Sequence, residues 1–146
     1  MTAKWQKFRV RAPDDFGPAM REALGREVTE FIRKRSEGGR DKNGKKFVKY
    51  TKEYTQSLDF KNAGKSKNKV DLTLSGDMLI ALDTISHRRG SILLGYENGS
   101  EENAKADGNV RGTYGQPTPN SSKARDFMGI KDKELDKLID KVRENF

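Results

Sequence analysis

The sequence contains no cysteine, a single histidine and no long apolar run. Without cysteine, the chain can form neither disulfide bonds nor thiolate metal sites. The one histidine, His87, cannot provide a cluster of imidazole ligands, and we interpret it as a surface residue beside two arginines. No segment approaches the roughly 20 apolar residues that cross a bilayer, and the first ten residues lack the apolar centre of a signal peptide. We therefore expect a soluble protein, made in a cytoplasm, without a metal or cofactor.

Apolar residues are scarce as well. Of the 146 residues, 32% are hydrophobic and 36% are charged, whereas an average globular domain has more of the first and fewer of the second. The length predicts a single domain that covers residues 1–146. Because ordering each residue costs roughly 1–2 kcal/mol of backbone entropy, a thin core leaves little margin of stability. We expect neighbouring subunits to supply part of the burial.

Positive charge is concentrated in one segment. The chain carries a formal net charge of +8, from 30 Lys and Arg against 22 Asp and Glu. Residues 40–69 hold ten basic and three acidic residues, which is nearly the whole excess. Such a block can be a solvated face, or it can bind DNA or an acidic protein surface. The candidate contacts in this segment are Arg40, Lys42, Lys45, Lys46, Lys49, Lys52, Lys61, Lys65, Lys67 and Lys69.

Apolar residues at spacings of three and four predict two amphipathic helices. The first begins near Pro18 and ends on a run of cations, Arg33 to Arg35, before two glycines. The second occupies residues 130–146. Before the first helix, residues 5–11 alternate between apolar and basic, which predicts a short edge strand with a basic outer face. The two apolar stripes consist of Met20, Leu24, Val28, Phe31 and Ile32, and of Leu135, Leu138, Ile139, Val142 and Phe146.

The densest apolar segment runs from residue 70 to residue 96. Alternation over residues 70–74 predicts a strand, and Ser75 can cap a short helix whose apolar positions continue to Ile85. Residues 91–94 predict a second buried strand that ends at Gly95. The fold class is therefore α+β: a small antiparallel or mixed sheet with a long N-terminal helix, a short central helix, a C-terminal helix and long loops. We expect the core in residues 14–36 and 70–96, together with the helix at 130–146.

Two polar segments separate these elements. Residues 37–69 begin as a glycine turn and continue as a flexible basic segment, in which Phe47, Tyr50 and Tyr54 fit either a short amphipathic helix or stacking on single-stranded bases. Residues 97–124 contain almost nothing apolar and several glycines and prolines. Structureless loops of that length are uncommon in compact domains. We therefore expect a flexible loop that becomes ordered against a neighbour.

Signals for catalysis are weak. Gly64-Lys65-Ser66 is similar to the end of a phosphate-binding loop, but Asp59 stands where that motif needs another glycine. The carboxylates are interspersed with lysines and have no spacing typical of an acid–base pair. We expect no catalytic residue, no cofactor site and no metal site.

The order of the motifs resembles the virion morphogenesis, or tail-completion (head–tail joining), family of tailed bacteriophages. The resemblance extends from about residue 14 to the end of the chain. In that family a Gly-x-x-Leu element starts the central helix and an Arg-x-Phe-Leu-Gly element introduces the last helix. The family's Trp-x-Pro-Leu is replaced here, and a glycine-rich loop replaces its Tyr-Ala and His-Gln segment. The matching segments are Leu74 to Leu79, Ile92 to Gly95 and Ala124 to Gly129, and the replaced motif is Phe47-Val48-Lys49-Tyr50.

This resemblance implies a non-enzymatic structural subunit of the virion, located at the neck or at the head-proximal end of the tail. It implies a homo-oligomeric ring around the DNA channel, assembled in the host cytoplasm, with other neck and tail proteins as partners and no membrane. The basic segment would face the DNA. Arg125 would hold the turn before Phe127 packs, and Gly129 would allow a backbone angle closed to other residues. The candidate interface residues are Arg125, Phe127, Met128, Gly129 and Tyr114.

Two other functions fit the same sequence. One is a monomeric basic module that binds nucleic acid through residues 42–69. The other is a small adaptor that binds an acidic protein.

Overall fold

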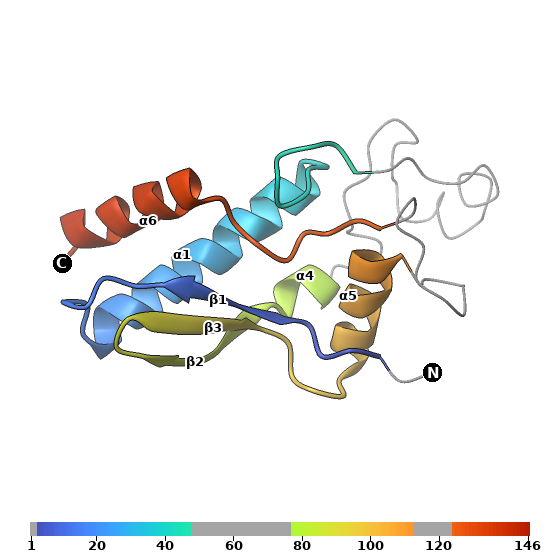
Figure 1. Cartoon of the computed structure of the whole chain (residues 1–146), viewed down its shortest axis with the longest axis horizontal. Coiled ribbons are helices and arrows are strands. Elements are labelled where there is room, and N and C mark those ends of the chain that lie inside the picture. Colours follow the sequence, from blue (N-terminus) through green and yellow to red (C-terminus); the bar gives the residue numbers. More distant parts are fainter. Residues whose placement is uncertain (1–2, 48–76, 113–123) are drawn as a thin grey trace.

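The computed structural model describes residues 3–47, 77–112 and 124–146 (Figure 1). The described elements are helices and one small antiparallel sheet, which confirms the α+β class. The order of the described elements is β1 (Lys7–Arg11), α1 (Pro18–Glu37), α4 (Asp77–Ile80), β2 (Asp83–Arg88), β3 (Ser91–Gly95), α5 (Glu101–Arg111) and α6 (Asp132–Glu144).

The sheet is antiparallel, and its three strands lie in the order β1-β3-β2. Strand β1 pairs with β3 from Lys7 opposite Gly95 to Arg11 opposite Ser91. Strands β2 and β3 form a hairpin that turns at Gly90, whose φ of 84° is a conformation that favours glycine. The expected strand at residues 5–11 is therefore confirmed, and it lies at an edge of the sheet.

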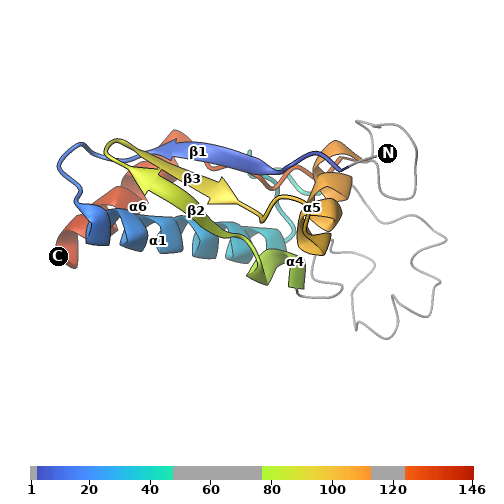
Figure 2. The same cartoon turned by 90° about the horizontal axis from the view of Figure 1, so that it is seen from below.

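The molecule has two layers (Figure 2). Helix α1 lies against one face of the sheet and α6 lies beside α1, and the opposite face carries no described element. Apolar side chains of the sheet, such as Ile92 and Leu94, are fully buried between the sheet and the helices. The apolar stripes of the two helices complete the core with Leu24, Val28, Ile32, Leu135, Ile139 and Val142.

Both long helices form where the periodicity predicts them. Helix α1 begins at Pro18, whose fixed φ suits a first helical position, and Lys34 and Arg35 occupy its last turn. Helix α6 begins two residues after Ile130. The last residue of its expected stripe, Phe146, lies beyond the helix end and is 65% exposed. Phe146 therefore does not join the core. None of the described helices is long and apolar enough to cross a membrane.

The central helix is shorter than expected. Helix α4 ends at Ile80, and Ile85 belongs to β2 instead of to the helix. The guanidinium of Arg33 stabilises the end of this helix, because it donates hydrogen bonds to the carbonyls of Leu79, Ile80 and Leu82. Pairing with β3 prevails over helical spacing for the residues that follow. The strand expected at residues 70–74 lies outside the described residues. So does the short helix or helical turn expected from Phe47 to Leu58, except for Phe47 itself, which is buried.

The segment at 97–124 was expected to be a flexible loop, and this is wrong for residues 101–111. They form α5, which Ser100 caps by accepting a hydrogen bond from the Asn103 N–H at 3.1 Å. Its inner face is mostly polar and is buried against the chain's own N-terminal segment, where the Asn103 side chain accepts from the Gln6 N–H at 2.7 Å. Helix α5 therefore needs no neighbour to become ordered. Residues 113–123 lie outside the described part.

Candidate binding groove

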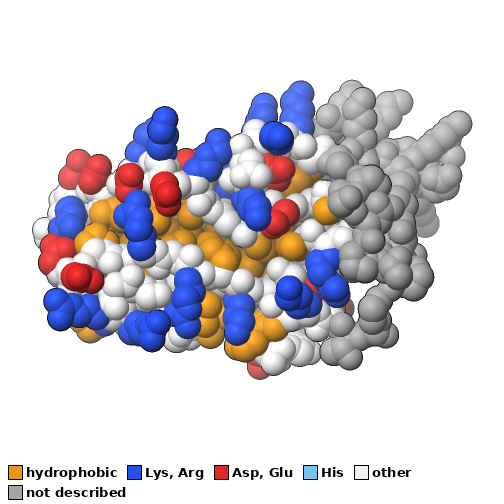
Figure 3. Space-filling view, viewed as in Figure 1, with side chains coloured by type: hydrophobic (Ala, Val, Ile, Leu, Met, Phe, Trp, Pro, Cys, Tyr) orange, Lys and Arg blue, Asp and Glu red, His pale blue; other side chains and the backbone are white. Residues whose placement is uncertain are grey.

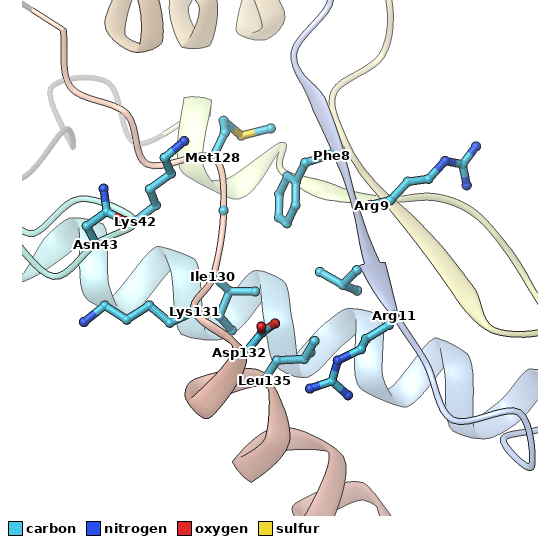
Figure 4. Close-up of a pocket in the computed structure, with 12 residues that line it drawn as sticks. Phe8, Arg9, Arg11, Lys42, Asn43, Met128, Ile130, Lys131, Asp132 and Leu135 are labelled. Carbon is cyan, nitrogen blue, oxygen red and sulfur yellow. The ribbon is translucent and has the colours of Figure 1, made fainter.

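A groove of about 420 Å³ opens between β1 and the segment that leads into α6 (Figure 4). Residues 8–11 of β1 form one wall, and residues 128–132 with Leu135 form the other. Lys42 and Asn43, from the turn after α1, lie at one end. The volume is within the range of about 300–1,000 Å³ typical of ligand clefts.

The floor of the groove is apolar. Alternate residues of a strand face opposite sides of the sheet, so Phe8 and Val10 face the groove and the helices. Figure 4 shows Phe8 directed into the groove and Arg9 directed away from it. Met128, Ile130 and Leu135 contribute apolar surface from the opposite wall. In the space-filling view, hydrophobic side chains occupy the middle of this face, with Lys and Arg side chains on both sides (Figure 3).

The rim is basic, with four cations and one carboxylate, Asp132, among the lining residues. Arg11 is paired with Asp136 of α6, and the hydrogen bond that its guanidinium donates to this carboxylate raises the pKa of Arg11. The Nζ of Lys42 lies 2.8 Å from an oxygen of Asp126. Two cations are thus already paired, which leaves Arg9 and Lys131 without a carboxylate partner within the described residues.

The edge of β1 presents backbone groups to the groove. The N–H of Tyr96 donates to the Gln6 carbonyl at 3.2 Å, and the N–H of Ala12 donates to the Gly90 carbonyl at 3.0 Å. In an antiparallel pair, the backbone N–H and C=O groups of successive residues point alternately toward the partner strand and away from it. Since Gln6 and Ala12 bond toward β3, the groups of Lys7, Arg9 and Arg11 point away from β3. Within the described part of the chain, no strand pairs with that edge.

Of the predicted basic contacts that the structure describes, only one lies in this groove. Lys42 lines it, whereas Arg40 donates to the Gly44 carbonyl at 2.8 Å within the turn itself. Lys45 and Lys46 lie exposed on the same turn. The sequence did not single out Arg9, Arg11 or Lys131 as contacts, although the expected basic edge strand contained the signal for two of them. Lys49, Lys52, Lys61, Lys65, Lys67 and Lys69 lie outside the described residues.

The predicted interface element is part of the chain's own core. Phe127 is fully buried, so the expectation that it contacts a neighbour is wrong. Met128 is 7% exposed, and the surface that it does expose lines the groove. The guanidinium of Arg35 binds this element, because it donates to the carbonyls of Phe127 at 2.6 Å and Gly129 at 2.8 Å.

The other three interface candidates differ in where they lie. The N–H of Arg125 donates to the Asn109 carbonyl at 2.6 Å, which ties this element to α5. Gly129 was expected to adopt a backbone angle that only glycine tolerates, and this is wrong, since its φ is not in the left-handed region. The glycine instead provides space, because a Cβ there would lie 3.1 Å from Cδ of Lys42. Tyr114 lies outside the described residues.

His87 lies half-buried beside α1. Its Nδ1 accepts a hydrogen bond from Nε of Arg21 at 3.0 Å, and its Nε2 lies 3.6 Å from a carboxylate oxygen of Glu22. His87 is therefore partly enclosed by α1, and the interpretation of it as a surface residue beside two arginines is incomplete. Among the described residues, no group of three or more His, Cys, Asp or Glu side chains could hold a metal ion.

Comparison of the chain with protein-family models, with curated proteins and with solved structures gives no match. The chemistry of the groove is therefore the basis on which its ligand can be argued: an apolar floor, a basic rim and an open strand edge.

Proposed function

We propose that the protein is a non-enzymatic structural subunit of a tailed-bacteriophage virion, located at the neck or the head-proximal end of the tail, where it forms a ring around the DNA channel. The observation that carries this proposal is the order of the motifs along the chain. A long helix, a glycine turn, a central helix and a strand ending at Gly95 precede the Arg125-to-Gly129 element and the last helix.

The described geometry gives the last of these motifs a physical role. The segment 125–129 precedes α6 and contains the buried Phe127. Hydrogen bonds from Arg35 attach it to the last turn of α1. It also forms a wall of the groove beside β1. The motif that carries the resemblance therefore also contributes Met128 and Gly129 to the groove.

Two features support assembly next to DNA. The sheet has two open edges within the described chain, at β1 and β2, and an open edge is a place where a strand of another protein can pair. Exposed cations on the turn after α1 would attract the phosphate backbone without regard to sequence.

Deletion of the gene from the phage genome that carries it tests the proposal. We expect DNA-filled heads and separate tails in electron micrographs of the lysate, with assembly restored by the gene on a plasmid. Infectious particles of normal yield and morphology would contradict the proposal.

The mass of the purified full chain, measured by light scattering over a range of concentrations, separates the alternatives. A ring predicts a mass that is a fixed multiple of the 16.5 kDa chain. A monomer that binds duplex DNA tightly at moderate salt would favour the nucleic-acid-binding module. A one-to-one complex with an acidic protein would favour the adaptor.

A further inference from the structure

We propose that the groove beside β1 binds an extended segment of a partner protein, with alternating acidic and apolar residues, and adds it to the sheet as a fourth strand. The site consists of the outer edge of β1, the apolar floor and the basic residues around them. The inference depends on this geometry alone, so it holds whether or not the protein belongs to a virion.

The backbone of β1 supplies the first requirement. The N–H and C=O groups of Lys7, Arg9 and Arg11 point away from β3, and no described strand occupies that side. Such an edge is a template for strand addition, in which main-chain hydrogen bonds provide affinity. The five residues of β1 match a strand of about 17 Å.

The side chains supply the second requirement, which is a pattern for the ligand. Successive side chains of an added strand point to opposite faces. Those that point toward the helices would meet Phe8, Met128 and Ile130 in the apolar floor. Those that point to the outer face would lie next to the exposed Arg9 and its basic neighbours on β1, where opposite charges contribute roughly 0.2–1 kcal/mol for each cross-strand pair. The ligand is therefore apolar on one face and acidic on the other.

A second copy of this chain is a poor occupant. Pairing β1 with β1 of another copy would place Lys7, Arg9 and Arg11 opposite the same cations, which destabilises a sheet. The other open edge, β2, has a register shift between Thr84 and Ser86 and carries the exposed Arg88. Such an irregularity interrupts regular pairing. Charge complementarity thus favours a different protein with an acidic extended segment.

The test uses the full chain and a fluorescent peptide with the sequence Glu-Val-Glu-Ile-Glu-Val-Glu, followed by anisotropy. Two matched peptides replace every glutamate with lysine or carry a methyl group on every backbone amide nitrogen. We expect each to bind at least about tenfold more weakly, because the first reverses the charge and the second removes the strand-forming donors. Failure of the glutamate peptide to bind, or equal binding by the N-methylated peptide, would overturn the proposal.

Two charge-reversal variants locate the site. Arg9→Glu, on the edge that faces the groove, is expected to weaken the peptide about tenfold, while Arg88→Glu, on the opposite edge, changes binding less than about twofold. If Arg9→Glu does not fold, Lys131→Glu on the other wall takes its place. Equal weakening by variants on both edges would mean attraction by net charge alone and would overturn the proposal.

Amide hydrogen exchange gives a direct readout. Exchange of the amides of Lys7, Arg9 and Arg11 is expected to slow when the glutamate peptide binds, since these are the donors that an added strand would bond. Duplex DNA serves as the competitor. If DNA displaces the peptide and the exchange of these three amides does not change with either ligand, the groove is a general polyanion surface and strand addition is excluded.

Discussion

At the scale of single residues, Arg35 connects the end of α1 to the segment before α6. It donates to the carbonyls of Phe127 and Gly129, and its burial lowers the pKa of the guanidinium. Its Nε is buried without a hydrogen-bond partner within the described residues, so the interaction depends on the two Nη groups. A buried acceptor that loses its donor costs about 1–3 kcal/mol.

We therefore expect Arg35→Met to lower the free energy of unfolding by about 1–3 kcal/mol for each carbonyl that water cannot reach. The matched control is Lys34→Met, because Lys34 is mostly exposed and its pairing with Glu30 contributes little. Urea denaturation of both variants measures the difference. Equal effects of the two substitutions would show that the junction does not depend on Arg35.

Asp107 is the second residue whose environment leads to a measurable prediction. Burial alone would raise the pKa of its carboxyl, but hydrogen bonds from Arg111 and Gln6 outweigh it, and the pKa lies below the ordinary 3.8. Both Arg111 contacts are 2.7 Å long, and Gln6 Nε2 donates at 2.9 Å. A carboxyl with a lowered native pKa stabilises the fold above its unfolded pKa and loses that contribution as the pH falls through the native value.

Asp107→Asn should cost about 1–3 kcal/mol at neutral pH, because Arg111 then lacks its carboxylate. Its stability should also fall less steeply than that of the natural chain below about pH 4, since asparagine does not titrate. Unfolding by urea across this pH range checks both parts. Parallel curves for the two proteins would assign the acid sensitivity to other carboxyl groups.

At the scale of elements, the packing of α1 on the sheet depends on Gly25. A Cβ at this position would overlap Oγ1 of Thr84 on β2, so the glycine permits the close approach of helix and strand. Gly25→Ala should gain up to about 1 kcal/mol of helix propensity but lose about 1–3 kcal/mol from overpacking. We expect a net decrease in thermal stability.

The double variant Gly25→Ala with Thr84→Ala provides the control. It removes the atom that would clash and retains the gain in helix propensity, so it should be more stable than Gly25→Ala alone. Thermal denaturation of the two single variants and the double variant forms a cycle. Additive effects would contradict a direct contact between these positions.

The elements also show what periodicity can predict. Helices α1 and α6 have continuous apolar stripes, and the sequence predicts both, as it predicts β1. Strand β2 was missed because its apolar residue, Ile85, lies at helical spacing from Leu82 and the strand is irregular between Thr84 and Ser86. Its pairing partner, which no local pattern reveals, determines its structure.

Helix α5 was missed for a different reason. Its buried face consists mainly of Asn103, Ala106, Asp107 and Gly108, so it has almost no apolar stripe to detect. The available signals were its ends: Ser100 before two glutamates, and Gly112 after Arg111. The groove was missed in part because its walls are far apart in sequence. Only the basic edge at residues 5–11 and Lys42 could be identified before the fold brought Lys131 beside them.

At the scale of the whole molecule, the size and continuity of the core can be compared with the expectation that neighbouring subunits supply part of its burial. Buried apolar residues from β1, α1, α4, β3, α5 and α6 form one contiguous cluster. Among the described large apolar residues, only Ile80, Ile85 and Phe146 are exposed. A ring could therefore form from subunits that are already folded.

This view predicts a cooperative monomeric fold. The single tryptophan, Trp5, donates to the Tyr96 carbonyl at 2.7 Å and reports on the end of the sheet near α5, whereas circular dichroism reports on all helices. Leu135→Ala, deep in the core, should cost about 2–5 kcal/mol, while Phe146→Ala, at an exposed position of the same C-terminal segment, should cost less than about 0.5 kcal/mol. At concentrations where light scattering shows the monomer, both probes should give one coincident transition in each protein, with a midpoint that does not depend on protein concentration. A midpoint that rises with concentration would mean that contacts between subunits supply part of the stability of the fold, as the low apolar content of the sequence suggests.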